Sequence, residues 1–140
     1  MSLALMSSDA TVPLASRVEI AVTPRARRRG LLGRMRLDAN AALILVPCAA
    51  IHTMFMRFPI DAIFVNGEGR AVQIVSRMRP WRIAICTAAR GVIELSAGTV
   101  ERRDIRVGDV VRLVEVGDSG PGVDESELEI VRECLELRAN

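Results

Sequence analysis

The strongest constraint on the fold of this chain is a pair of strand-like segments joined by a short turn. Residues 61–65 (DAIFV) and 70–75 (RAVQIV) flank the sequence Asn66-Gly67-Glu68-Gly69. An Asn-Gly pair readily adopts the positive φ angles that hairpin turns require. The sequence therefore predicts a β-hairpin near the middle of the chain.

Other segments predict further short strands and a few short helices. Residues 17–22 alternate apolar and polar side chains, which is typical of a half-buried strand, whereas the apolar run 41–46 predicts a strand buried on both faces. Further strands are predicted at 51–56, 83–86, 91–95 and 110–116. Helices are predicted from Pro24 to about Gly33, from a Thr99 cap through Arg103, and from a Ser126 capping box to about Arg138.

Strands outnumber helices and follow one another without helical crossovers. We therefore predict a mainly β (α+β) fold, a compact antiparallel β-sandwich or barrel-like core with two or three short helices. The 140 residues suffice for one core, and a hydrophobic content of 50% is typical of a globular protein. The expected organisation is a flexible N-terminal extension (1–16), a single β-rich domain (17–116), and a linker with a C-terminal helix (117–140).

Charge is unevenly distributed along the chain. Residues 1–90 hold thirteen arginines and five acidic residues, a balance of +8, whereas residues 91–140 hold six and twelve, a balance of −6. The basic segment 25–36 could bind phosphates, but one Trp, three Phe and no Tyr are poor material for base stacking. We therefore interpret that segment as a solvated helix and do not favour a nucleic-acid partner.

Three sequence features that this chain lacks, a long apolar run, a CxxC pair and a secretory signal, indicate its expected cellular compartment. No apolar run approaches the roughly 18 residues of a membrane-spanning helix, so we expect no membrane span. The three cysteines form no CxxC pair, which predicts free thiols in a reducing compartment. Residues 1–16 lack the basic region and long apolar stretch of a secretory signal, so the cytoplasm is the default, and an incomplete N-terminus would leave export open.

The segment His52-Thr53-Met54-Phe55-Met56 is the most unusual motif. In a strand, His52, Met54 and Met56 would point to one side, and an imidazole with two thioethers could hold Cu(I) or Ag(I). The alternative, which we favour, is that the methionines fill the core and the histidine is satisfied by a hydrogen bond. No metal or other cofactor is therefore expected.

Two carboxylates are candidate site residues. Asp61 follows a proline turn, where it could orient His52 or instead accept backbone N–H groups and fix the turn, and we weigh these alternatives equally. Glu94 lies inside an apolar run on the same side as Val92. There it is either a buried acid with a partner or, as is commoner, an exposed residue on an edge.

The order of several motifs resembles the family known as domain of unknown function 192. The resemblance rests on the segments RGLLGR (29–34), HTMFM (52–56), PIDAIF (59–64), VIELSAG (92–98) and IRVGD (105–109), and it spans about residues 18–113. It implies a compact β-rich domain and no established reaction. Besides His52, Met56, Asp61 and Glu94, the matching residues, to which we assign structural roles, are Arg29, Gly30, Pro59, Gly98, Gly108 and Asp109. Family members usually have an aromatic residue at position 54, so the soft-metal strip is not a family property.

No catalytic signature such as GxSxG, HExxH, a P-loop or GxGxxG is present, so we lean against an enzyme. Our first hypothesis is a module that binds a small polar or anionic molecule, or a protein, in a polar cleft. That cleft would be built from His52, Arg57, Asp61 and Glu94. The alternative is a weak hydrolase or lyase in which a carboxylate works with His52 as acid and base.

Overall fold

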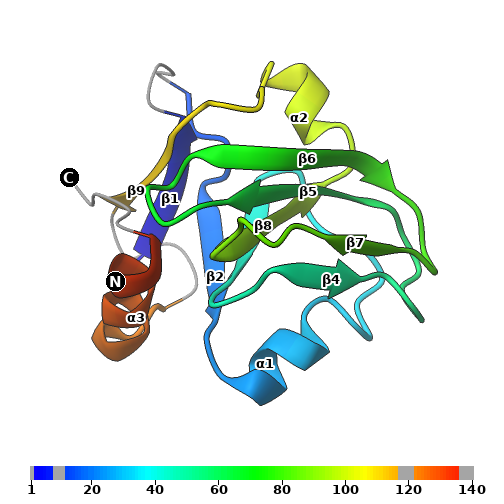
Figure 1. The fold of residues 1–140 in the computed structure, drawn as a ribbon, viewed down its shortest axis with the longest axis horizontal. Helices are drawn as coiled ribbons and strands as arrows, with labels where there is room; N and C mark the ends of the chain where they lie inside the picture. Colours follow the sequence, from blue (N-terminus) through cyan, green and yellow to red (C-terminus); the bar gives the residue numbers. More distant parts are fainter. Residues whose placement is uncertain (1, 8–11, 117–121, 136–140) are drawn as a thin grey trace.

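Figure 1 shows the fold in a computed structural model, which describes residues 2–7, 12–116 and 122–135. These ranges contain nine strands and three short helices. The strands are β1 (Ser2–Ser7), β2 (Arg17–Ala21), β3 (Ala41–Leu45), β4 (Ala50–His52), β5 (Ile60–Val65), β6 (Ala71–Met78), β7 (Ile83–Ile85), β8 (Gly91–Ser96) and β9 (Val111–Val116). The helices are α1 (Pro24–Arg29), α2 (Thr99–Arg102) and α3 (Glu125–Leu135). None of these helices has the length and apolar content that crossing a membrane requires.

A five-stranded sheet in the order β2-β3-β8-β5-β6 forms the centre of the fold, and β1–β9 and β4–β7 form two smaller sheets. The predicted hairpin is confirmed as the antiparallel pair β5–β6. The mainly β fold is also confirmed, and the described strands close no barrel. The prediction that strands follow one another without helical crossovers is wrong at one place: the connection from β2 to β3, which pair in parallel, contains α1. Parallel neighbours require such a crossover connection.

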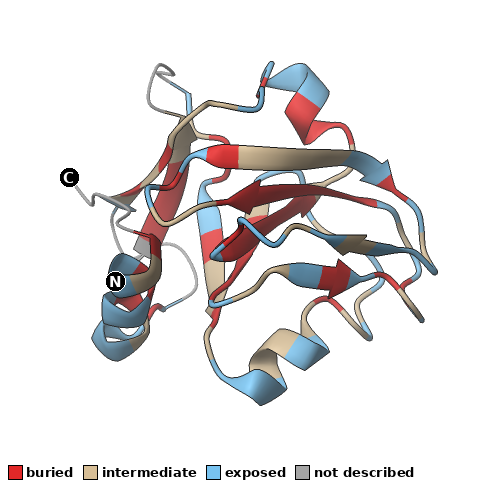
Figure 2. Ribbon diagram, viewed as in Figure 1, coloured by how far each residue is buried: buried red, intermediate tan, exposed pale blue. Residues whose placement is uncertain are grey.

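The core has two layers, one on each face of the central sheet. Strand β5 is buried along its whole length, as Figure 2 shows, and its side chains alternate between the layers. Ile63 packs in the layer that contains β1, β9 and α3, whereas Phe64 packs in the layer that contains Ile51 of β4 and Leu31 after α1. The second layer forms the floor of the pocket described below.

The N-terminal residues differ from the expected flexible extension. Strand β1 pairs antiparallel with β9, and Leu3 and Leu5 are almost fully buried in the first layer. The apolar segment 3–6 is too short to identify a strand by itself. Its partner strand lies more than 100 residues away in the sequence, so no local pattern indicates the pairing either. Residues 8–11 lie outside the described ranges.

Two helix boundaries differ from their predictions. Helix α1 ends at Arg29 because Gly30 leaves the helical conformation with a φ of +45°. At α2 the N-terminal cap is Gly98 rather than Thr99. Thr99 is buried inside the helix, and its hydroxyl pairs with that of Ser96 at 2.9 Å.

The capping box of α3 lies two residues before its predicted position. The Asp124 carboxylate accepts the Ser126 N–H at 2.9 Å, and Glu127 accepts the Asp124 N–H at 3.4 Å. Leu128, Val131 and Leu135 are buried on one face, as the helical spacing predicts. Residues 136–138, which the prediction assigned to this helix, are outside the described part of the chain.

We expect the substitution Asp124→Ala to lower the urea midpoint of unfolding, because it removes the acceptor at the N-terminus of α3. Ser126→Ala should cost less, because the backbone N–H of residue 126 that the Asp124 carboxylate accepts remains, and only the side-chain hydrogen bond to that carboxylate is lost. A larger loss from Ser126→Ala than from Asp124→Ala, measured by circular dichroism, would place the cap where the sequence predicted it.

Candidate functional site

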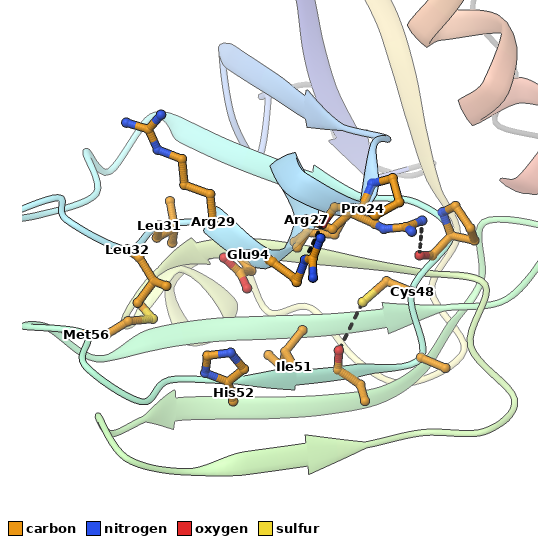
Figure 3. Close-up of a pocket in the computed structure, with 16 residues that line it drawn as sticks. Pro24, Arg27, Arg29, Leu31, Leu32, Cys48, Ile51, His52, Met56 and Glu94 are labelled. Carbon is orange, nitrogen blue, oxygen red and sulfur yellow. Dashed lines mark hydrogen bonds between the residues drawn. The ribbon is translucent and has the colours of Figure 1, made fainter.

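A pocket of about 620 Å³ lies between α1, the segment that follows α1, and β4 (Figure 3). Its floor is the second core layer, with Leu45 of β3 and Glu94 of β8. The polar and ionisable side chains that line it are Arg27, Arg28, Arg29, Cys48, His52 and Glu94.

Helix α1 is positioned over this pocket by contacts at both ends. At its start the Thr23 hydroxyl accepts the Ala26 N–H at 3.0 Å, and Pro24 occupies the first turn. Farther along, the Arg27 guanidinium donates to the carbonyl of Pro47 at 3.0 Å, on the loop after β3. The helix itself has no buried residue, and Arg28 and Arg29 are exposed to solvent.

Glu94 is the most unusual residue of the site. Its side chain is only 4% exposed, and its Oε2 atom has no hydrogen-bond partner among the described residues. Burial raises the pKa of this carboxyl from its ordinary value of 4.5 to about 7, and the positive charge of Arg34 opposes that rise. Figure 3 shows the carboxylate below α1 and facing the pocket.

The exposed position favoured for Glu94 is therefore corrected. Strand alternation correctly places Glu94 on the side of Val92, because Ile93 and Leu95 pack in the opposite layer. That side is covered by α1 and β4. No local sequence pattern reveals such a cover, because these elements reach it from other parts of the chain.

His52 and Cys48 complete the polar lining. His52 is the last residue of β4 and its side chain is exposed at the pocket. The Cys48 thiol donates to the Ala50 carbonyl at 3.1 Å, and burial raises the pKa of the thiol. All three cysteines are free thiols, and the raised pKa keeps that of Cys48 protonated at neutral pH.

Two of the four predicted cleft residues lie elsewhere. Asp61 is fully buried, and its two oxygens accept the backbone N–H groups of Arg77 at 2.8 Å and Val100 at 2.9 Å. Of the two alternatives for Asp61, the backbone one is therefore observed. Arg57 is exposed and its guanidinium lies 3.1 Å from the sulfur of Met35. The pocket thus brings together His52 and Glu94, but neither Arg57 nor Asp61 lines it.

The geometry assumed for the soft-metal strip is wrong. The strand stops at His52, and a turn follows in which the Met56 N–H donates to the Thr53 carbonyl at 3.2 Å. Strand alternation therefore does not extend to Met54, which is absent from the pocket lining, whereas Met56 is buried there. The described residues also contain no group of three or more His, Cys, Asp or Glu side chains suited to a metal ion.

Two pocket residues were not predicted from the sequence, and the residues with assigned structural roles at positions 98, 108 and 109 lie outside the pocket. Arg27 and Arg28 were interpreted only as part of a solvated helix, because their exposure gives no sign of what they face. Gly98 and Gly108 have φ angles of +93° and +101° at turns, and the Asp109 carboxylate accepts the Arg106 N–H at 2.9 Å. The assignment of Pro59 as a structural residue remains a prediction.

Two known proteins are similar to this chain in sequence. A UPF0127 protein of Pyrococcus abyssi is 31% identical over 116 residues, which cover 79% of this chain and 97% of that protein. A UPF0127 protein of Pyrococcus furiosus is 34% identical over 62 residues, 44% of this chain and 53% of that protein.

Two crystal structures are similar in fold, each with 22% sequence identity. A protein of unknown function from Novosphingobium aromaticivorans has a TM-score of 0.70 and is matched over 80% of this chain and 84% of its own. A candidate transcription regulator from Sinorhizobium meliloti has a TM-score of 0.67, with 79% and 90% covered. The family model of domain of unknown function 192, described as "Uncharacterized ACR", matches residues 5–113. The chain therefore belongs to the family of domain of unknown function 192.

Proposed function

We propose that this protein binds a small anionic molecule that also carries a hydrogen-bond donor, in the pocket between α1 and β4. The observation that carries the proposal is the buried Oε2 atom of Glu94, which has no partner among the described residues. Native proteins pair nearly all buried polar atoms, so each exception asks for an explanation. A donor group on a ligand would supply the missing partner.

The arginines of α1 indicate the charge at the other end of the ligand. Arg28 and Arg29 line the pocket and are exposed, and neither forms an ion pair with a described residue. Figure 3 shows the Arg29 side chain extending away from Glu94 and His52, so Arg28 is the better placed of the two for a ligand in the pocket. Guanidinium groups bind phosphate and carboxylate oxygens by charge-assisted hydrogen bonds. An anionic group at the arginines and an ammonium, hydroxyl or amide at Glu94 would complement both ends of the pocket.

Phosphoethanolamine is a suitable probe, because it joins a phosphate to an ammonium group. We expect it to bind more tightly than inorganic phosphate or ethylamine alone, as measured by isothermal titration calorimetry. His52 is the chain's single histidine, so its ring signals provide an unambiguous NMR readout of occupancy. Equal affinity for phosphoethanolamine and inorganic phosphate would contradict a role for Glu94.

The substitution Glu94→Gln removes the negative charge but keeps the shape of the side chain. We expect it to weaken phosphoethanolamine binding by roughly tenfold or more, the effect of losing a charge-assisted hydrogen bond. Glu68→Gln, at the exposed β5–β6 turn, is the matched control and should leave the affinity unchanged. Wild-type affinity in Glu94→Gln would overturn the proposal.

Acid and base catalysis is a second candidate function, because a carboxyl with a pKa of about 7 lies in the same pocket as His52. Such a carboxyl can both release and accept a proton near neutral pH. If the protein is a hydrolase, it should cleave 4-nitrophenyl acetate or 4-nitrophenyl phosphate with a pH profile centred near 7. Glu94→Gln should abolish that profile, and wild-type rates equal to those in buffer would reject this candidate for these probes.

A further inference from the structure

A second surface, separate from the pocket, combines exposed apolar side chains with arginines. Four large apolar residues are more than half exposed on or beside β7: Phe55 (72%), Trp81 (55%), Ile83 (60%) and Ile85 (61%). Arg79 and Arg82 lie on the same stretch of chain and are also exposed. We call these six residues the β7 face.

The two aromatic rings are held in place by an unusual backbone. Phe55 and Trp81 have φ angles of +64° and +67°, a region that non-glycine residues rarely adopt, and their ring centroids lie 4.6 Å apart. The Trp81 N–H donates to the carbonyl of Thr53 at 2.9 Å. The buried Thr53 hydroxyl also lies between the two loops, donating to the Arg79 carbonyl at 2.6 Å and accepting the Arg82 N–H at 2.9 Å.

This arrangement costs free energy without burying the rings. Positive φ angles at non-glycine residues persist only where surrounding contacts enforce them, and they concentrate at functional sites. Here the enforced conformation leaves a Phe and a Trp, whose ring planes are tilted by 56° to one another, in contact with water. An exposed aromatic pair of this kind indicates a surface that is covered in the functional state.

The charges beside β7 indicate what kind of partner covers the β7 face. A groove beside β7, of about 670 Å³, is lined by Arg77, Arg79 and Arg82 together with Ile83 and Ile85, and it contains no acidic side chain. Arg77 pairs with Glu101, but Arg79 and Arg82 form no ion pair with a described residue. The β7 face therefore complements a negatively charged surface.

We propose that the β7 face docks onto an anionic lipid bilayer. Tryptophan is suited to the boundary between headgroups and acyl chains, because its ring is apolar and its indole N–H is polar. Arginine side chains have apolar stems that lie along the membrane surface while the guanidinium reaches phosphate oxygens. A bilayer also needs no matching shape, so a few projecting rings and two unpaired arginines suffice for reversible attachment.

The test uses the intrinsic fluorescence of Trp81, the only tryptophan in the chain. Unilamellar vesicles of equal parts phosphatidylglycerol and phosphatidylcholine should shift its emission to shorter wavelength, and lipids with brominated acyl chains should quench it. Pure phosphatidylcholine vesicles should give a much weaker effect, and added salt should reduce binding. An unchanged emission spectrum with the anionic vesicles would overturn the proposal and leave the β7 face as a candidate protein-docking surface.

Three single-arginine variants show where the contact lies. Arg79→Ala and Arg82→Ala should each lower the vesicle partition coefficient by roughly fivefold, the usual contribution of one basic side chain near an anionic membrane. Arg103→Ala, which removes an exposed arginine next to α2, is the matched control and should have little effect. Equal losses in all three variants would show that net charge alone drives binding, and would also overturn the proposal.

The apolar contribution is tested by Phe55→Ser, which should reduce quenching by the brominated lipids while preserving the far-ultraviolet circular dichroism spectrum. Glu94→Gln should bind vesicles like the wild type, because Glu94 lies in the other pocket. Vesicle binding and ligand binding can therefore fail independently of each other.

Discussion

Replacing Asp61 with alanine is expected to lower the free energy of unfolding by about 3–5 kcal/mol, because two charge-assisted hydrogen bonds are lost together. The carboxylate is fully buried and accepts the backbone N–H groups of Arg77 and Val100. It thereby connects β5 to the irregular end of β6 and to α2. Alanine would leave both N–H groups without these acceptors, and Val100 is itself buried. Urea unfolding followed by circular dichroism measures the loss.

Two further variants separate this explanation from a general effect of removing a carboxylate. Asp61→Asn should cost roughly half as much, because the amide has one accepting oxygen where the carboxylate has two. Asp38→Ala, at an exposed residue paired only with Arg36, should change stability by less than about 0.5 kcal/mol. Similar losses for Asp61→Ala and Asp38→Ala would show that the two backbone contacts contribute nothing.

The substitution Glu94→Gln is expected to stabilise the protein at alkaline pH, in contrast to most changes at buried positions. The pKa of Glu94 is about 7 in the folded protein, whereas an unfolded glutamate has a pKa near 4.5. Because the folded pKa is the higher one, folding favours the protonated form. Wild-type stability should therefore decrease as pH rises from about 4.5 to about 7, and stay low above it.

At pH 8 the penalty for ionising Glu94 inside the protein is about 3 kcal/mol, from the size of its pKa shift. Glutamine has no such penalty, so the difference in stability between Glu94→Gln and wild type should grow across this pH range. Urea midpoints at pH 4.5, 6 and 8 measure the difference, with Glu68→Gln as the exposed control. A difference that does not change with pH would mean that the Glu94 carboxyl is solvated and that its pKa is the same in the folded and unfolded protein.

The predictable parts of the fold are those recorded in local sequence patterns. The Asn66-Gly67 turn marked the β5–β6 hairpin, and the apolar run at 41–46 marked β3 as a buried strand. The parallel pairing of β2 with β3, and the pairing of β1 with β9, were not predicted. Both depend on partners distant in sequence, and the apolar segment of β1 is too short to stand out alone.

The candidate site was predicted only in part, because its residues also come from segments that are distant in the sequence. His52 and Glu94 were identified, yet the sequence could not show that α1 covers the carboxylate and that Arg28 lines the same pocket. Arg57 and Asp61 are close to His52 in the sequence, but the strand ends at His52 and a turn separates them from the pocket. Nearness along the chain was therefore a poor guide to nearness in the site.

The most direct test of this account is a pH titration of the Glu94 side-chain carboxyl by ¹³C NMR, assigned by comparison with Glu94→Gln. We expect a midpoint near 7 in the free protein, and a lower midpoint with phosphoethanolamine bound, because the ammonium group favours the ionised carboxylate. A midpoint near 4.5 that the probe does not move would contradict both the burial of Glu94 and its proposed role in binding.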